Sequence, residues 1–201
     1  MSTVRTPVYA QGNKNFMTQE LLEDKSDYVG DAYIWDKEGL ISAAFTFARE
    51  ETEFPADDIS DFVVITGEAT GEGTVTLRGI ECETYKRVIN IGNTVDGVTF
   101  GENLGIKRFG LSFDAQRNDG SIDKYVFFCC RYNGMPAVNT NTLSGSVQEP
   151  TVTMPIRITP IIYKKADGSY GKAIFKVLNS VKHPAAFNLY KDRFVIPNQT
   201  P

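Results

Sequence analysis

Side chains that could carry acid–base chemistry are scarce in this chain of 201 residues. Histidine, the group that most often exchanges protons near neutral pH, occurs once, as His183 directly before Pro184. General acid–base catalysis needs such a group within hydrogen-bond reach of a partner. A lone histidine beside a proline does not indicate that arrangement. We therefore expect a protein that is not an enzyme and that uses no cofactor.

Carboxylates gather in residues 50–58, which read Glu-Glu-Thr-Glu-Phe-Pro-Ala-Asp-Asp. A calcium loop requires oxygen ligands in a fixed order around a central glycine, and this run has neither. Pro55 removes a backbone donor from any strand ladder, and the charges oppose burial. The pattern favours an acidic loop that protrudes into solvent, and no metal site is expected.

Cysteines and glycines also lack the spacings of a functional motif. Cys82, Cys129 and Cys130 form neither a Cys-x-x-Cys metal motif nor an even-numbered disulfide framework. Neighbouring strand residues face opposite sides, so the adjacent pair indicates packing positions. Residues 67–73 hold three glycines, but they lack the Gly-Lys-Ser/Thr end of a phosphate loop and include two glutamates. We expect a turn between strands there.

The single tryptophan, Trp35, lies near Tyr33 and is flanked by Asp31, Asp36 and Glu38. Two interpretations fit this aromatic pair. It can form an exposed platform on which a sugar ring stacks, or it can anchor the foot of an N-terminal arm. Aromatic anchors are the more frequent case, and we favour that interpretation.

The overall composition narrows the class of protein. An aromatic content of 11% favours strands over a helical bundle, and 41% hydrophobic residues suit a folded domain. The longest uncharged apolar run, residues 125–130, is far below the ~20 residues that cross a bilayer, and no signal peptide opens the chain. The net charge is −4, and the longest basic cluster is Lys164-Lys165. We expect synthesis in a cytoplasm, no membrane, and no sequence-specific nucleic-acid binding.

Alternation of apolar and polar residues predicts the strands that position these groups. Period-two patterns cover residues 41–49, 74–78, 106–114 and 151–159, and the composition of residues 61–66 also predicts a strand. Residues 122–131 are apolar on both faces, which predicts a covered central strand that follows the turn Asn118-Asp119-Gly120. Pro155 cannot donate to a ladder, so the strand 151–159 is expected at an edge or at a bulge. Residues 161–163 and 172–178 predict a further hairpin.

One segment, residues 80–89, has a helical pattern with Cys82, Tyr85, Val88 and Ile89 on one face. The predicted fold class is mainly β, an antiparallel two-sheet β-sandwich with one flanking α-helix. Residues 1–30 are expected to form an N-terminal arm, residues 31–180 the β-sandwich domain, and residues 181–201 a C-terminal arm. The aromatic residues of that last arm are expected to dock.

This order of elements resembles that of bacteriophage major tail tube proteins, especially those of long-tailed phages of Gram-positive hosts. The resemblance runs from about residue 30 to residue 178. It includes the strand 41–49, the acidic loop ending Phe54-Pro-Ala-Asp-Asp58, the hairpin into residues 73–78 and the helix 80–89. The strands 106–114 and 124–131, the long loop, the strand 151–160 and the turn at residues 167–170 follow in the same order.

The resemblance implies a structural virion protein, made in the host cytoplasm and located in the tail. Its partners would be copies of itself in stacked hexameric rings, together with tape measure and tail terminator proteins. Inner strands of all subunits would join into one barrel through which DNA passes during ejection without specific binding. An acidic inner wall suits that role because tight phosphate contacts would hold the DNA back.

Two sets of residues are expected to act in such an assembly. Ring stacking is assigned to the acidic loop, and its deletion from residue 51 to 57 is expected to leave a folded protomer that cannot stack. The stacking residues are Glu50, Glu51, Glu53, Phe54, Pro55, Asp57 and Asp58. Outward-facing acidic residues are expected to line the lumen, and the candidates are Glu68, Glu72, Asp114 and Asp123.

Two alternatives remain open at this point. One is a different phage or contractile injection system component, either a tube or a connector, which would share the β-sandwich architecture. The other is a monomeric carbohydrate-binding β-sandwich module that uses Trp35 and nearby tyrosines. Long self-assembled tubes would favour the tail tube, whereas glycan binding that Trp35→Ala abolishes would favour the module.

Overall fold

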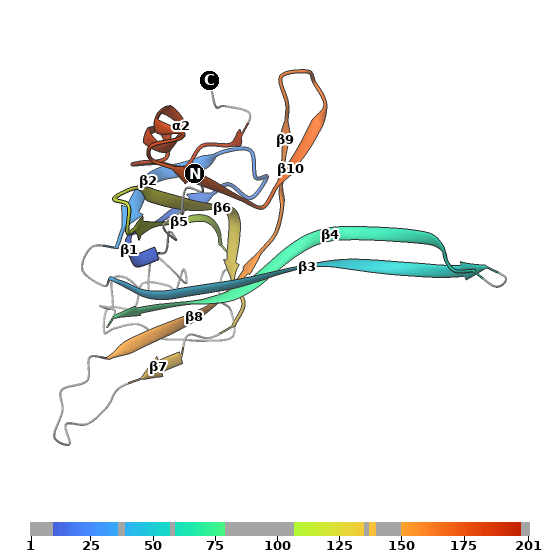
Figure 1. Cartoon of the computed structure of the whole chain (residues 1–201), viewed down its shortest axis with the longest axis horizontal. Coiled ribbons are helices and arrows are strands. Elements are labelled where there is room, and N and C mark those ends of the chain that lie inside the picture. The colour runs from blue at the N-terminus through green and yellow to red at the C-terminus, as the bar shows by residue number, and fades with distance from the viewer. Residues whose placement is uncertain are drawn as a thin grey trace, which may run out of the picture.

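The computed structural model describes residues 10–35, 39–56, 59–78, 107–134, 137–139 and 150–197. These residues form eleven strands and one short helix (Figure 1). The strands are β1 (Ala10–Leu21), β2 (Tyr28–Ile34), β3 (Leu40–Ala56), β4 (Ile59–Arg78), β5 (Arg108–Arg117), β6 (Ile122–Tyr132), β7 (Ala137–Asn139), β8 (Thr151–Ile158), β9 (Ile161–Lys164), β10 (Tyr170–Ala173) and β11 (Phe175–Asn179). The helix is α2 (Pro184–Leu189). The predicted fold class, mainly antiparallel β, is confirmed, while the helix predicted at residues 80–89 lies outside the described residues.

One antiparallel sheet of nine strands makes the body. Its order is β2-β1-β5-β6-β8-β4-β3, with β11 paired to β6 and β7 paired to β8. The sheet divides at β6, whose first half pairs with β11 and whose second half pairs with β8. The β8-β4-β3 part can therefore turn across the β1-β5-β6 part, which gives a sandwich-like body. β9 and β10 form a separate hairpin that projects from it (Figure 1).

Two apolar clusters hold the body together, one on each side of β6. The inner cluster brings Phe127 of β6 against Leu111 of β5 and Met154 of β8. The outer cluster contains the next residue of β6, Phe128, together with Tyr190 from the C-terminal segment. Neighbouring strand residues point to opposite faces, so a continuous apolar run fills both clusters. The prediction of a central strand covered on both sides is confirmed.

The β5–β6 hairpin also follows the sequence pattern. Gly120 has a φ of +81°, a conformation that glycine adopts without strain. The carboxylate of Asp119 accepts hydrogen bonds from the backbone N–H (2.9 Å) and the hydroxyl (2.6 Å) of Ser121. These contacts close the predicted Asn-Asp-Gly turn and fix the register of the two strands.

The N-terminal residues correct the expectation of an arm. Residues 10–21 form β1, which pairs with β5 along one edge and with β2 along the other. Phe16 and Met17 are almost fully buried, and the register shifts between Lys14 and Met17. Asn15 sits in this bulge with a φ of +50°, and asparagine tolerates that conformation. The bulge interrupts the alternation, which explains why the sequence pattern did not reveal a strand.

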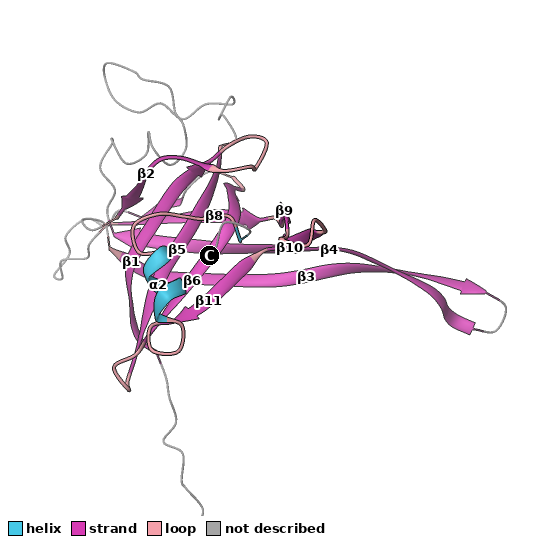
Figure 2. Cartoon of the chain, turned by 90° about the horizontal axis from the view of Figure 1, so that it is seen from above, coloured by secondary structure: helices cyan, strands magenta, loops and turns pink. Residues whose placement is uncertain are grey.

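The C-terminal segment packs on the outer face of the sheet, as its aromatic residues predict. Tyr190 and Phe194 are buried in the outer cluster. The side chain of Gln19 on β1 accepts a hydrogen bond from the backbone N–H of Phe194 (2.8 Å) and donates one to the carbonyl of Gly30 (2.6 Å). The tyrosine hydroxyl donates to the carbonyl of Val195 (3.1 Å). Figure 2 shows α2 lying across the strands.

Strand β8 is not an edge strand, which corrects the interpretation of Pro155. It pairs with β4 along its whole length and, on its other side, with β7 at residues 151–153 and with β6 at residues 156–158. Pro155 lies between these two ladders, where its carbonyl accepts a hydrogen bond from the backbone N–H of Asn133 (3.0 Å). Its missing donor faces this interruption, so the proline is tolerated inside the sheet.

Candidate assembly surfaces

The largest unusual feature of the molecule is the hairpin of β3 and β4. The two strands pair from Leu40↔Leu77 at the body to Ala56↔Ile59 at the far end. Strand β8 covers β4 only from Gly71 to Arg78. Beyond that point the hairpin is a two-stranded ribbon that projects well away from the body (Figures 1 and 2). We call residues 48–56 and 59–70 the distal ribbon.

The expected stacking loop is part of this ribbon. Glu50, Glu51, Glu53, Phe54 and Pro55 lie in β3, which continues seven residues beyond the predicted strand end at residue 49. The prediction of an irregular loop is therefore wrong for these residues. The register shifts between Phe54 and Ala56, which accommodates the missing donor of the proline between them. Asp57 and Asp58, at the end of the ribbon, lie outside the described residues.

The glycine-rich stretch at residues 67–73 is also strand and not the predicted turn. A Cβ atom added to Gly73 would lie 2.0 Å from the carbonyl oxygen of Ala44 and 2.6 Å from the ring of Phe45. One added to Gly71 would lie 2.6 Å from the ring of Phe47. The glycines therefore allow the aromatic rings of β3 to lie across β4, a recognised role of glycine in sheets.

Two long backbone edges on this hairpin have no partner among the described residues. Within the described ranges, strand β3 hydrogen-bonds only with β4, and no described residue pairs with its other edge. No described strand pairs with residues 59–70 of β4 on the edge that faces β8 in the body. Unpaired N–H and C=O groups in such rows favour pairing with another strand. The ribbon thus presents one open edge on each of its two sides.

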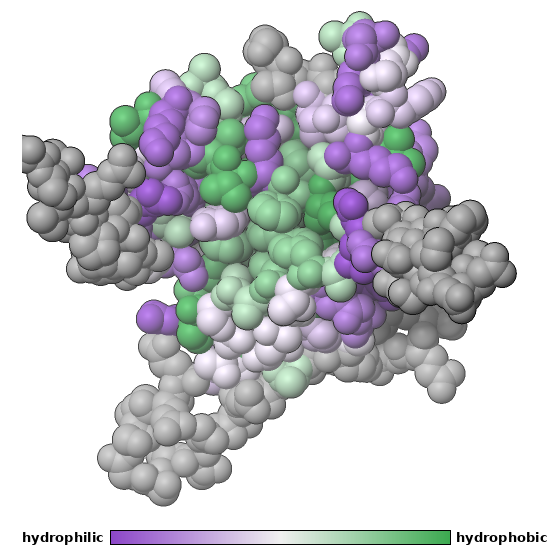
Figure 3. Space-filling view, turned by 45° about the vertical axis from the view of Figure 1, so that its right-hand side comes forward, coloured by the Kyte–Doolittle hydropathy of each residue, from purple (hydrophilic) through white to green (hydrophobic). Residues whose placement is uncertain are grey.

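Apolar side chains are exposed where β3 meets β11. Phe47 is 40% exposed and stacks on Phe175, which is 44% exposed, at a ring distance of 4.9 Å. Val177, two residues after Phe175 on β11, is 40% exposed. Figure 3 shows apolar residues gathered at the centre of one face of the molecule and bordered by hydrophilic ones. Large exposed apolar groups of this kind are common in surfaces that bind another protein.

The four lumen candidates fall into two groups. Glu68 and Glu72 on β4 are exposed, as expected, with side-chain exposures of 54% and 59%. Glu68 pairs with Lys172 of β10, and the hydrogen bond and charge of that lysine lower the pKa of the carboxyl group. Glu72 lies 3.9 Å from the guanidinium of Arg157. Their assignment to a lumen stays a prediction.

Asp114 and Asp123, by contrast, are buried, so the expectation that they face outward is wrong. The Asp114 carboxylate lies 2.6 Å from the ammonium of Lys124, and the amide of Asn15 donates a hydrogen bond to its second oxygen (2.8 Å). Asp123 pairs with Arg117 and accepts a hydrogen bond from the amide of Asn179 (2.8 Å). Burial of a charge is tolerated when an opposite charge and hydrogen bonds accompany it.

The aromatic pair around Trp35 is an anchor, as favoured above. Trp35 is 2% exposed, and its indole N–H donates a hydrogen bond to the hydroxyl of Thr18 (3.0 Å). Its ring contacts those of Phe16 and Tyr33 at 5.5 Å and 5.2 Å. A buried ring cannot stack on a sugar in solvent, so the carbohydrate platform on Trp35 is contradicted.

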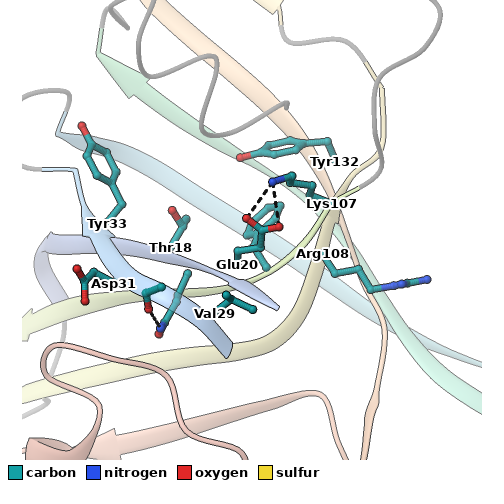
Figure 4. A pocket seen from close by; sticks show the side chains of 11 residues that line it. Thr18, Glu20, Val29, Asp31, Tyr33, Lys107, Arg108 and Tyr132 are labelled. Atoms are coloured by element: carbon teal, nitrogen blue, oxygen red, sulfur yellow. Dashed lines mark hydrogen bonds and ion pairs between the residues drawn. The ribbon is translucent and has the colours of Figure 1, made fainter. Parts of the chain in front are cut away.

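A polar pocket between β1, β2 and the start of β5 is drawn in Figure 4. Two of its four charged side chains already pair with each other, since Lys107 lies 2.9 Å from Glu20. No cysteine, serine or histidine is among the described residues that line it. His183 lies elsewhere, in the exposed turn before α2, where its ring nitrogen is 3.5 Å from the backbone N–H of Asn179. Within the described ranges, no three His, Cys, Asp or Glu side chains are grouped to hold a metal ion.

Cys129 and Cys130 are buried free thiols, which confirms their predicted packing role; Cys82 lies outside the described residues. Burial raises the pKa of Cys130 well above its usual value.

We expect a Cys82→Ser variant to resist alkylation near neutral pH while folded, and to react at both cysteines after denaturation. Mass spectrometry after iodoacetamide treatment measures this. Rapid modification of the folded protein would contradict the buried placement.

The part of the chain that the structure describes has no helix long and apolar enough to cross a membrane.

Similarity of this chain to known proteins is found among solved structures. No protein-family model matches it, and no curated protein does. Among solved structures, it is similar to a chain in the cryo-EM structure of the anti-feeding prophage baseplate, 6-fold symmetrised. That match covers 89% of this chain and 97% of the other, at 7% sequence identity and a TM-score of 0.42.

Proposed function

We propose that this protein is a structural virion component, the major tail tube protein of a phage or phage-derived particle. Its copies assemble into hexameric rings, and the rings stack into a tube for DNA passage. The observation that supports this most is the distal ribbon, which carries an open edge on each side. A two-stranded ribbon by itself is only marginally stable in water, so a partner for these edges is expected.

The two open edges are different surfaces, and this sets the kind of assembly they form. The edge of β3 in one copy can pair with the free edge of β4 in the next copy. Such a contact is head-to-tail, and a head-to-tail contact produces a closed ring when its rotation closes. A closed barrel of strands leaves no open edge. The exposed ring of Phe47 on β3 and the ring of Phe175 that stacks on it would be covered by a neighbour.

The charge of the ribbon fits a channel for DNA. Glu68 and Glu72 are exposed on β4, and we assign them to the inner wall of the tube. A wall of carboxylates repels phosphate, so DNA can pass without being held. The tape measure and tail terminator proteins would be the further partners in the tail.

Electron microscopy of the purified protein tests this function. We expect negatively stained samples to contain six-fold rings and long tubes at high protein concentration. Closed single rings that never stack would instead indicate a connector. A protein that stays monomeric at all concentrations in sedimentation experiments would overturn the proposal.

Proline substitutions in β3 test the role of its open edge. Successive backbone N–H groups of a strand point to opposite edges, so Ala48→Pro and Arg49→Pro remove donors from opposite sides of β3. Both positions lie beyond the part of β4 that β8 covers. The variant whose lost N–H group points away from β4 should melt close to the wild-type temperature and form no rings. Arg49→Ala, which keeps the donor, serves as the control, and normal rings from both proline variants would exclude this edge as the ring contact.

A further inference from the structure

Three arginines lie side by side across neighbouring strands of the nine-stranded sheet. Arg131 of β6 is the direct cross-strand partner of Arg157 of β8. On the other side of β6, Phe109 of β5 pairs with Cys130. The residues directly outside that pair are Arg108 and Arg131, so the antiparallel ladder brings these two together as well. Neighbouring strands are about 4.8 Å apart, which makes the row about 10 Å long. We call Arg108, Arg131 and Arg157 the arginine row.

The arginine row lies on the face of the sheet that points away from the inner cluster. The residues on either side of Arg131 and of Arg157 pack in the inner cluster or against it, and so does Phe109 beside Arg108. Successive residues of a strand point to opposite faces, so the three arginines share the other face. Each of them is partly exposed. The row is therefore within reach of a ligand from solvent.

The charges of this row are poorly compensated by the described part of the chain. The guanidinium of Arg157 has one carboxylate nearby, that of Glu72 at 3.9 Å. Arg108 donates a hydrogen bond to the backbone carbonyl of Glu23 (3.4 Å), and Arg131 has no ion pair with a described carboxylate. The Nε atoms of Arg131 and Arg157 are buried, and neither donates a hydrogen bond to a described group. Like charges directly opposite each other destabilise a sheet, so the row favours an anion as its partner.

We propose that the arginine row binds a phosphate group. A guanidinium presents N–H donors in a planar fork that matches the oxygens of phosphate, and it keeps its charge at any physiological pH. The inference rests on the proposed function for the source of the phosphate, which is the backbone of the DNA that passes through the tube. Arg157 and Glu72 are cross-strand partners on one face, so the row belongs to the same wall as Glu72.

Glu72 limits how firmly this wall holds phosphate. Its carboxylate competes with phosphate for the guanidinium of Arg157, so the contact is weak and exchanges readily. Contacts with phosphate carry no sequence information, which agrees with passage of DNA that is not read. The wall then combines carboxylates that repel the backbone with one arginine row in each copy that contacts it.

Substitutions in the row test the site through binding of a short fluorescent DNA duplex, measured by anisotropy in dilute solution at about 0.05 M salt. Arg131→Gln and Arg157→Gln should each weaken binding about tenfold, the usual contribution of a hydrogen bond to a charged group. Each should also lower the slope of log affinity against log salt by about one unit. Glu72→Gln should instead strengthen binding, because it removes the competing carboxylate.

Thermal unfolding shows whether the variants remain folded. Arg131→Gln removes one of two opposed like charges, so it should melt no lower than the wild type. Inorganic phosphate should raise the melting temperature of the wild type more than that of Arg131→Gln. Arg131→Lys keeps the charge and loses the planar fork, so its affinity for the duplex should lie between those of the wild type and Arg131→Gln.

The matched control is Arg49→Gln, which changes an exposed arginine of β3. Arg49 lies two residues after Phe47, whose ring stacks on Phe127 of the inner cluster, so it is on the other face of the sheet. This variant should bind the duplex as the wild type does.

The possible results separate the source of the phosphate from the site itself. Arginine variants that lose stabilisation by inorganic phosphate and bind the duplex normally would support a phosphate site and overturn the contact with DNA. Variants that change neither measurement overturn the site, as would a row whose substitution abolishes binding of polyglutamate and leaves binding of the duplex intact. None of these measurements requires rings, so absence of rings in electron micrographs overturns the proposed function and leaves the phosphate site standing.

Discussion

A protein shortened at the distal ribbon should fold as a normal protomer and form neither rings nor tubes. The sequence alone suggests a deletion of residues 51–57, but that change would leave residues 59–66 of β4 without their partners on β3. A deletion of residues 50–68 removes both strands in register. It joins the cross-strand pair Arg49↔Ala69, which an Asn-Gly turn can close. The pairing of β4 with β8 begins at Gly71 and is retained.

The expected result follows from what the ribbon contacts. Its two strands pair there only with each other, and the deletion also removes the pair of Glu68 with Lys172, which is exposed. The loss should therefore change the free energy of unfolding by no more than about 1 kcal/mol. The same deletion removes most of the free edge of β4 and all seven carboxylates of residues 48–70. Sedimentation velocity and negative-stain images measure the assembly, and urea unfolding measures the stability.

The other projecting hairpin supplies the control for this deletion. Replacing residues 165–169 by Asn-Gly shortens the β9–β10 hairpin at the register pair Lys164↔Tyr170. That variant should assemble as the wild type does. Normal tubes from the ribbon deletion would show that the ribbon does not hold the copies together.

A Lys124→Ala variant should lose about 3–5 kcal/mol of stability, the usual cost of leaving one charge of a buried pair without its partner. Lys124 is 2% exposed, and its ammonium is the cation beside the buried carboxylate of Asp114. It also lies 5.3 Å from the ring of Phe187 on α2, so the loss should loosen the C-terminal segment. Urea unfolding followed by circular dichroism measures the effect.

Two further variants test whether the loss of stability comes from the unpaired buried charge. The double variant Asp114→Leu with Lys124→Leu removes both charges and keeps the positions apolar, so it should recover most of the lost stability. Lys107→Ala breaks the exposed pair with Glu20, and exposed pairs contribute about 0–1 kcal/mol. Equal losses from Lys124→Ala and Lys107→Ala would contradict the role given to burial.

Local patterns predicted the centre of the fold well. The β5–β6 hairpin follows from the Asn-Asp-Gly turn and from an apolar run that fills both faces of β6. Counting outward from Asp119 at this turn pairs residue 114 with residue 124, an aspartate opposite a lysine. That cross-strand pair was a signal for the buried ion pair, and it was available in the sequence. The general expectation that carboxylates face solvent hides this signal.

The sequence was less informative where partners distant along the chain decide the structure. β1 carries a bulge at Asn15, so its pattern breaks although β5 and β2 hold it in the sheet. The ribbon contains Pro55 and seven carboxylates, which locally oppose a strand, yet cross-strand pairing extends it to Ala56. Pro155 lies inside a sheet because two separate ladders meet β8 on either side of it. None of these pairings is visible within a window of a few residues.

The close approach of Ala44 and Phe45 to Gly73 has a mechanical consequence for the proposed ring. The ribbon leaves the body at this point, and the missing side chains of Gly71 and Gly73 determine how closely β3 lies over β4. A methyl group added at Gly73 would push β3 away from β4 and would change the angle at which the ribbon leaves the body. In a ring of identical copies, every subunit would repeat that small angular error, and the ring would fail to close at the same number of subunits. The bore of the proposed tube would therefore be encoded in part by two residues that have no side chain.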